Sequence, residues 1–253
     1  MSLERIYTGD IPVLGDPRLA EDGSRTQPAP LFLLADSQLL FWPEEEGPFA
    51  DRIAAAAPAA PRAAYLGASN GDNPDFYSIF LAAMERIGPA ECRMIPAVPS
   101  DDERAYLEAA ELVVLAGGDV ERGWRAFQAS GVNELVERRY REGVVLVGVS
   151  AGAVQLGTAG WPAGNPDAPF GTWGLAPFVV DAHAEDADWA ELRTVVAARG
   201  EGARGFGIPR GGGLVYHPDG SVEAVRRPLY EFTVVGGELV TATILPPAAA
   251  AEW

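Results

Sequence analysis

The chain has 253 residues, 48% of them hydrophobic, and a formal net charge of −17. This length suits one large α/β domain or two small ones, and no apolar stretch approaches the roughly 20 residues of a membrane span. The negative charge repels nucleic acid and anionic membranes, so neither is expected as a partner. The only cysteine, Cys92, cannot form an internal disulfide, and the N-terminus lacks the basic-then-apolar order of a secretory signal. The sequence therefore predicts a cytoplasmic location.

Residues 1–30 show no periodicity, and we expect an irregular lead-in there, followed by one α/β hydrolytic domain over residues 31–253. Short apolar runs predict buried strands at 31–34, 63–66, 92–95, 112–115 and 144–149. Helical spacing predicts helices at 49–57, 75–87, 101–110 and 119–141, the last broken near Gly131. In the second of these helices the spaced apolar residues are Phe76, Ile79, Phe80 and Met84. This alternation predicts a mostly parallel sheet with helices on both faces.

The last third of the chain has a different pattern. Six short runs predict strands at 178–180, 205–208, 213–216, 222–225, 230–235 and 238–244. The last two runs are joined by a Gly-Gly hairpin turn, and one helix is expected at 187–198. We expect antiparallel strands to extend the sheet at its C-terminal edge.

The clearest chemical signal lies between a predicted strand and a predicted helix. Gly148–Gly152 reads Gly-Val-Ser-Ala-Gly and fits the motif G-x-S-x-G. In a nucleophile elbow the serine occupies a strained turn at the carboxyl end of a strand, and the flanking glycines avoid clashes with neighbouring backbone. Ser150 is therefore the candidate nucleophile. No Gly-Lys-Ser/Thr follows, which excludes a P-loop.

A serine nucleophile needs a general base, and the chain has two histidines. His183 follows a predicted strand, and strand ends on the side of the elbow are where α/β active sites assemble. His217 precedes a Pro-Asp-Gly turn and is more typical of a solvated loop. We therefore favour His183 as the base.

A glycine pair, Gly117–Gly118, ends the predicted strand 112–115. Backbone approaches a ligand most easily where no Cβ intervenes, so this pair could supply an oxyanion donor. It could equally form an ordinary strand-to-helix turn with Asp119 as the N-cap. The sequence is compatible with both interpretations.

Three segments, taken in order, resemble the peptidase E (aspartyl dipeptidase) and cyanophycinase family of serine peptidases. They are Leu115–Asp119, Gly148–Ala153, and Gly174–Leu175 leading to Val180–His183. The resemblance implies a fold like that of class I glutamine amidotransferases, with serine replacing their cysteine. It implies hydrolysis of small peptides through a Ser150 acyl-enzyme, with His183 as general base and no metal or organic cofactor. It also implies an oxyanion hole formed by the backbone amides of Gly118 and Ala151.

The chain departs from this family where an acidic residue is expected after the last core helix. The corresponding segment is Gly207–Gly211, and Arg210 occupies the position of the carboxylate. An arginine cannot orient an imidazolium. We take Asp167 as the third catalytic residue, with Asp181, a Ser–His dyad or a defective triad as alternatives.

A second departure concerns the substrate. Aspartyl dipeptidases carry an arginine after the histidine that recognises an acidic side chain, whereas the segment here is mostly acidic and Arg193 matches only if the register slips. A neutral or basic residue is as compatible with the sequence as aspartate. The sequence thus predicts a dipeptidase or exopeptidase acting on small peptides. The alternatives are a catalytically silent relative that binds a peptide or metabolite and an esterase or amidase on the same elbow; a homodimer is left open.

Overall fold

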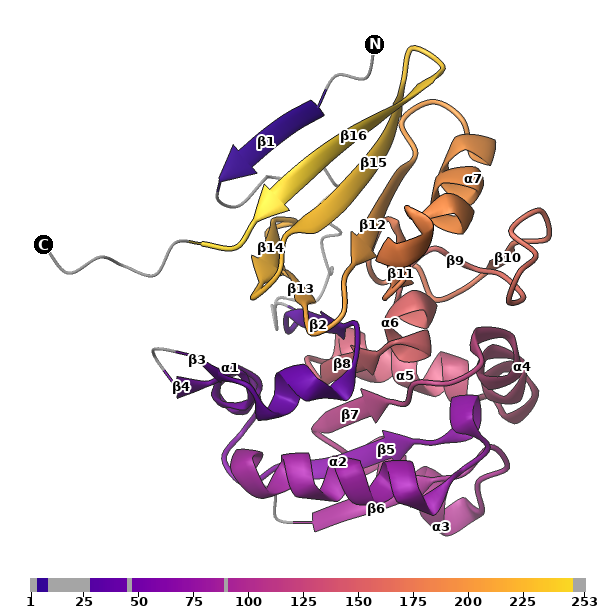
Figure 1. The fold of residues 1–253 in the computed structure, drawn as a ribbon. Coiled ribbons are helices and arrows are strands. Elements are labelled where there is room, and N and C mark those ends of the chain that lie inside the picture. Colours follow the sequence, from indigo (N-terminus) through magenta and orange to yellow (C-terminus); the bar gives the residue numbers. More distant parts are fainter. Residues whose placement is uncertain (1–3, 9–27, 45–46, 89–90, 248–253) are drawn as a thin grey trace, which may run out of the picture.

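The computed structural model describes residues 4–8, 28–44, 47–88 and 91–247 (Figure 1). Its centre is a seven-stranded sheet with the strand order β14-β13-β2-β8-β7-β5-β6. Five adjacent strands are parallel: β2 (Leu31–Leu34), β8 (Val145–Val149), β7 (Leu112–Leu115), β5 (Arg62–Leu66) and the edge strand β6 (Glu91–Ile95). At one edge, β13 (Gly213–Tyr216) and β14 (Val222–Val225) add antiparallel pairings. The expected mostly parallel sheet with antiparallel strands at its edge is confirmed.

Helices cover both faces of this sheet because successive strand residues point to opposite sides. In β2, Leu31 and Leu33 pack on one face, whereas Phe32 and Leu34 pack on the other. The second face carries α1 (Phe49–Ala56) and α2 (Pro74–Ile87). The first face carries α3 (Asp101–Ala109), α4 (Val120–Ser130), α5 (Val132–Arg141) and α6 (Ala151–Leu156). The break between α4 and α5 falls at Gly131, as predicted, with φ of 71°.

A second sheet lies above the first in Figure 1, with the order β1-β16-β15-β12-β11. Its strands are β11 (Val179–Ala182), β12 (Arg204–Ile208), β15 (Leu229–Val235), β16 (Glu238–Leu245) and β1 (Glu4–Thr8). This corrects the expectation that all the late strands extend one sheet. Alternation along a strand fixes which residues face inward but does not identify the partner strand.

The lead-in expected to be irregular also contains a strand, since β1 pairs in parallel with β16. One face of the second sheet is covered by α7 (Ala190–Ala198), which starts three residues later than predicted. The other face contributes Val180, Phe206 and Leu229 to the same core that holds Leu33 of the first sheet. The two sheets therefore share one continuous core.

Short elements complete the described chain. Two-residue strands form the pairs β3 (Pro43–Glu44) with β4 (Gly47–Pro48) and β9 (Ala159–Gly160) with β10 (Phe170–Gly171). No helix in the described ranges is long and apolar enough to cross a membrane.

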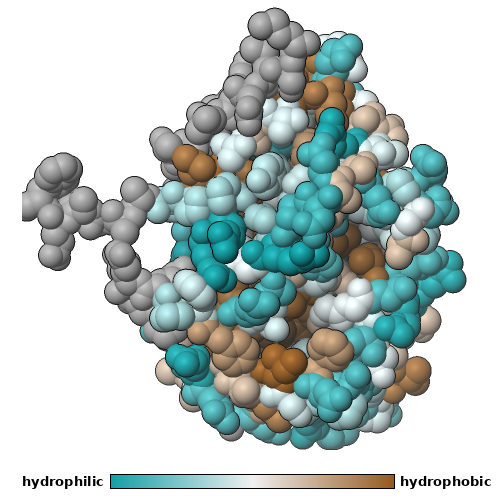
Figure 2. All heavy atoms as spheres, viewed as in Figure 1, coloured by the Kyte–Doolittle hydropathy of each residue, from teal (hydrophilic) through white to brown (hydrophobic). Residues whose placement is uncertain are grey.

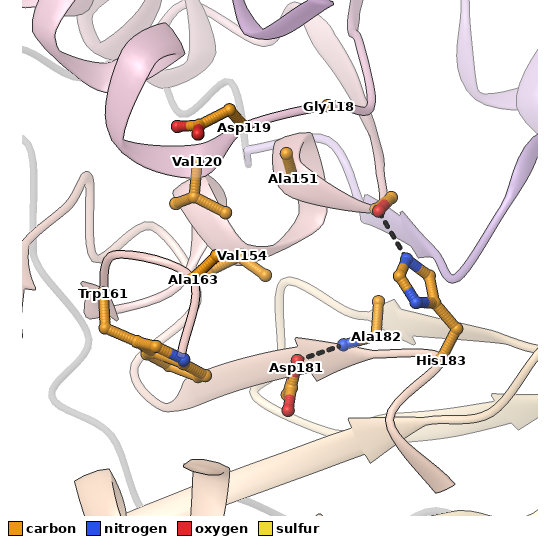
Figure 3. A pocket seen from close by; sticks show the side chains of 11 residues that line it. Gly118, Asp119, Val120, Ala151, Val154, Trp161, Ala163, Asp181, Ala182 and His183 are labelled. Atoms are coloured by element: carbon orange, nitrogen blue, oxygen red, sulfur yellow. Dashed lines mark hydrogen bonds between the residues drawn. The ribbon is translucent and has the colours of Figure 1, made fainter. Parts of the chain in front are cut away.

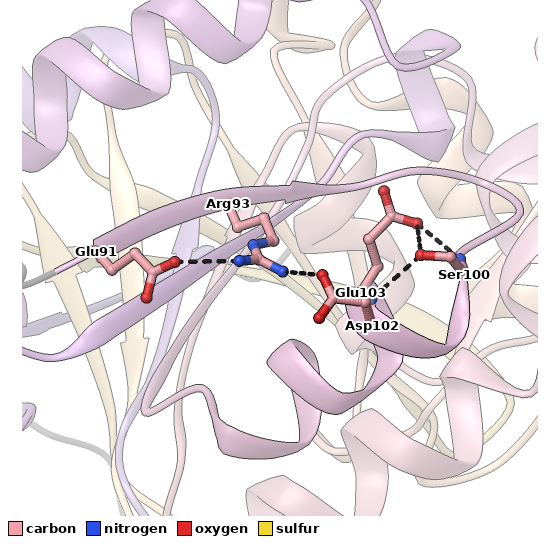
Figure 4. Close-up of polar contacts among 5 residues, drawn as sticks. All are labelled: Glu91, Arg93, Ser100, Asp102 and Glu103. Carbon is pink, nitrogen blue, oxygen red and sulfur yellow. Dashed lines mark hydrogen bonds and ion pairs between the residues drawn. The ribbon is translucent and has the colours of Figure 1, made fainter.

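Polar contacts fasten α3 to the edge strand β6 (Figure 4). The Ser100 hydroxyl accepts from the Glu103 N–H, and the Glu103 carboxylate accepts from the Ser100 N–H, so both ends of a capping box are formed. Arg93 of β6 pairs with Asp102 at 2.6 Å and with Glu91 at 3.3 Å. These contacts hold the edge farthest from the late strands.

Candidate active site

Ser150 lies in a tight turn between β8 and α6. Its φ and ψ are 50° and −109°, a conformation that L-residues rarely adopt. The turn is held by its own backbone, because the Ser150 N–H donates to Leu34 O at 2.8 Å and the Ser150 carbonyl accepts from Ala153 N at 2.9 Å. Strain of this kind persists only where the surroundings impose it, and it is common at functional sites.

The flanking glycines of the motif are required by close backbone packing. A Cβ on Gly148 would lie 2.6 Å from the carbonyl carbon of Gly152, and a Cβ on Gly152 would lie 2.4 Å from Leu115 O. Neither contact can be relieved by moving a flexible side chain. The G-x-S-x-G pattern therefore brings α6 directly against β8 and β7, and Ser150 projects at the carboxyl ends of these strands.

His183 follows β11 and reaches Ser150 from the second sheet (Figure 3). Its Nε2 lies 2.8 Å from Ser150 Oγ, within hydrogen-bond distance. The residue has φ of 49°, and its N–H donates to Ile208 O at 2.9 Å. The other histidine, His217, is bonded to Glu223 at 3.0 Å. The structure thus brings together the predicted nucleophile and the predicted base.

The loop after β7 places Gly118, one of the two predicted oxyanion donors, at the same cleft as Ser150. Gly118 has φ of 135°, and a Cβ there would lie 2.2 Å from Ser69 O, so only glycine fits. Gly118 and Ala151 line the same cleft as Ser150 and His183. In the described part of the chain, no acceptor takes a hydrogen bond from the N–H of Gly118 or of Ala151. Both groups are available to a substrate oxygen.

A buried polar network supports this loop, and the sequence pattern did not reveal it. Gln155 of α6 is fully buried, and its Nε2 donates to Val120 O at 2.9 Å and to Ser69 Oγ at 3.1 Å. Ser69 O accepts from Asp119 N at 2.8 Å and from the Arg122 guanidinium. The network links α6, which carries Ser150, to the segment that carries Gly118. A lone Gln in a helix gives no signal of such a role.

No acid is hydrogen-bonded to His183 among the described residues. Asp167, the predicted third residue, lies exposed between β9 and β10 and has no hydrogen bond to His183. Arg210 does not approach the imidazole either, since its guanidinium pairs with Asp186 at 2.8 Å. Its N–H donates to Glu185 Oε1 at 3.0 Å, and the other oxygen of that carboxylate is buried without a hydrogen-bond partner. In the described ranges the Ser150–His183 pair therefore has no hydrogen-bonded acid, and Asp167 as the third residue stays a prediction.

Asp181, the alternative acid, lies on β11 with its carboxylate at the cleft. Its Oδ1 accepts from Ala182 N at 2.9 Å, not from His183 (Figure 3). Burial raises the pKa of Asp181 to about 7, against the lowering effect of the Ala182 N–H, and nearby Glu191 and Glu185 raise it further. A carboxyl group with this pKa carries both protonation states near neutral pH.

Ser150 and His183 lie between two clefts of different chemistry. The acidic cleft, of about 200 Å³, is lined by Asp119, Asp181 and Trp161 among others. The apolar cleft, of about 240 Å³, is lined mainly by hydrophobic side chains from the segment after β2 and from α2. Among the described residues, no cluster of three or more His, Cys, Asp or Glu side chains is arranged to hold a metal ion.

Comparison with known proteins fits this geometry. The fold is similar to a crystal structure of a peptidase from an acI-B1 Actinobacterium, with a TM-score of 0.63 and 14% identity over 88% of this chain and 96% of the other. It is also similar to a putative peptidase E protein from Listeria monocytogenes EGD-e, with a TM-score of 0.56 and 13% identity over 85% and 98% of the two chains. No curated protein matches this chain in sequence. The family model of peptidase family S51 matches residues 48–221, and the chain therefore belongs to this family.

Proposed function

We propose that the protein is a serine peptidase that hydrolyses small peptides, as a dipeptidase or exopeptidase, through an acyl-enzyme on Ser150. The observation that carries the proposal is the 2.8 Å contact between Ser150 Oγ and His183 Nε2 beside the free N–H groups of Gly118 and Ala151. Nucleophile, base and oxyanion donors are the parts that acyl transfer requires. Membership of peptidase family S51 supports the peptidase class.

The steps follow from this arrangement. His183 Nε2 takes the Ser150 proton as Oγ bonds to the substrate carbonyl carbon, and the oxygen of the tetrahedral intermediate accepts from Gly118 and Ala151. His183 then donates the proton to the leaving amine as the C–N bond breaks. A water molecule, deprotonated by His183, releases the acyl group and restores Ser150.

A fluorophosphonate probe with mass-spectrometric mapping tests the nucleophile. Labelling should occur at Ser150, and both labelling and peptide cleavage should be lost in Ser150→Ala. His183→Ala should remove nearly all activity, because no other base in the described part of the chain is hydrogen-bonded to Ser150 Oγ. His217→Ala is the matched control and should retain activity, since its ring pairs with Glu223. An unlabelled wild-type Ser150, beside a control hydrolase that labels, would refute the proposal.

One observation favours a second function. His183 has no hydrogen-bonded acid among the described residues, which is compatible with a catalytically silent protein that binds a small peptide or metabolite. A dipeptide library read by mass spectrometry, with matched esters, separates peptidase, esterase and silent binder.

The unpaired Cys92 supports a proposed cytoplasmic location.

A further inference from the structure

The apolar cleft has the properties of a subsite for a side chain. Ser150 and His183 both line it, so its occupant lies next to the bond that these residues would attack. Its volume of about 240 Å³ is below the roughly 300–1,000 Å³ of pockets for whole drug-sized ligands. The cleft is thus sized for one side chain. In Figure 2, brown apolar residues gather where the surface is hollowed between the two halves of the molecule.

Two exposed apolar side chains of α2 form part of its wall. Phe76 is 48% exposed and Ile79 is 40% exposed, although both fit the helical apolar spacing that predicts burial. Phe80 and Met84, from the same pattern, are buried in the core. The helix therefore leaves apolar surface facing the cleft that nothing in the described residues covers. Leu40 and Val114 are further apolar lining residues.

Two polar side chains of the apolar cleft, those of Asp36 and Tyr65, are already engaged in hydrogen bonds. Asp36 accepts from Gln38 N at 2.9 Å and from Gly211 N at 2.7 Å, one bond to each carboxylate oxygen. The Tyr65 hydroxyl accepts from Asn70 Nδ2 at 2.9 Å. No Lys or Arg is among the described lining residues. An acidic substrate side chain would therefore have no described Lys or Arg side chain to pair with in this cleft. A basic substrate side chain would meet only the Asp36 carboxylate, which already accepts two backbone N–H groups.

We infer that the apolar cleft binds a large aliphatic or aromatic side chain, such as Leu or Phe, on a residue flanking the bond cleaved at Ser150. The inference deepens the proposed function and rests on Ser150 being the nucleophile. Burying such a side chain corresponds to a gain in affinity of roughly 10- to 100-fold over alanine. Ile79 is the residue that sets this preference most directly, because it faces the cleft from an exposed helix position.

Binding to the Ser150→Ala protein tests the subsite without requiring turnover. Two peptide series, X-Ala and Ala-X with X as Ala, Leu, Phe, Asp or Lys, are titrated by calorimetry. In one series Leu or Phe should bind about 10- to 100-fold more tightly than Ala. Adding Ile79→Gln to the Ser150→Ala protein should remove most of this difference in affinity. Adding Leu81→Gln should preserve it, since Leu81 is 38% exposed on the same helix but does not line the cleft.

A variant that gains affinity for a different peptide must be folded, so it excludes misfolding as the reason for the affinity lost in Ile79→Gln. Ile79→Lys places a cation at the cleft and should make the Asp peptide the tightest binder of its series. Equal affinities for Ala, Leu and Phe, or a preference that survives Ile79→Gln, would overturn the subsite. A wild-type dimer that Ile79→Gln converts to monomers would also overturn it, by assigning the surface to a second copy of the chain. Failure of fluorophosphonate to label wild-type Ser150 would refute the proposed function and cleavage beside the cleft, whereas the binding series would still report whether the cleft holds the side chain.

Discussion

The orientation of His183 is set by backbone contacts. Its N–H is fixed to Ile208 O, its φ is positive, and its ring meets Ser150 Oγ. Asp167 is exposed and makes no contact with this ring. Because Asp167 has no hydrogen bond to His183, we predict that Asp167→Asn leaves kcat/KM nearly unchanged and shifts stability by no more than about 0.5 kcal/mol. Steady-state cleavage of the best dipeptide from the library checks this, and a loss above tenfold would show that the loop carrying Asp167 reaches His183 during turnover.

Asp181 makes stability depend on pH. Burial raises the pKa of Asp181 from the usual 3.8 to about 7, so the folded state binds this proton more tightly than the unfolded chain. The free energy of unfolding therefore falls as pH rises from about 4 to about 7, by at most about 4 kcal/mol. Asp181→Asn should stabilise the protein at pH 8 and have a much smaller effect at pH 4. Urea unfolding at the two pH values measures this, and an equal gain at both would contradict it.

At the scale of an element, the turn between β7 and α4 positions Gly118, a proposed oxyanion donor. Gly118→Ala introduces a Cβ 2.2 Å from the Ser69 carbonyl oxygen and a positive φ that alanine disfavours. The turn must shift, so we predict a loss of about 10²–10³ in kcat, the effect of removing one oxyanion donor. Gly171→Ala is the matched control, because a Cβ there meets no atom within 4 Å. Equal activity of the two variants, measured on one peptide, would exclude Gly118 as a donor.

Several elements could be predicted because they carry local signals. The apolar runs of β2, β7 and β8 are buried on both faces of a parallel sheet, so they need no alternation to be recognised. The second sheet could not be predicted, since the pairing of β12 with β15 and β11 depends on contacts distant in the sequence. For the same reason the sequence gives no signal for β1, which pairs with the distant β16.

Some parts of the candidate site also carry a local sequence signal, and others do not. The sequence favours Ser150 as the nucleophile, and the strained turn and the crowded glycines beside it agree with this prediction. The choice of Asp167 as the third residue stays a prediction, because an exposed loop has no sequence pattern that fixes its position relative to His183. The exposure of Phe76 and Ile79 was also missed, since helical spacing records which face is apolar but not whether a neighbour covers it.

At the scale of the whole molecule, the active site depends on how the two sheets meet, because Ser150 follows a strand of the first and His183 a strand of the second. Phe178 is buried at this junction, with its ring 4.6 Å from that of Phe206 in β12 and 5.5 Å from that of Tyr216 in β13. Phe178→Ala should lower the free energy of unfolding by about 3–5 kcal/mol, because a cavity would remain between the sheets.

Since one core joins the sheets, tryptophan fluorescence and far-ultraviolet circular dichroism should report the same urea midpoint in wild type and in Phe178→Ala. Val235→Ala is the control for the second sheet; this side chain is 55% exposed, and its loss should change stability by no more than about 0.5 kcal/mol. Two separate midpoints in wild type would mean that the sheets unfold independently. In that case the contact between Ser150 and His183 would be lost before the parallel sheet unfolds, and peptide cleavage would disappear at the lower midpoint.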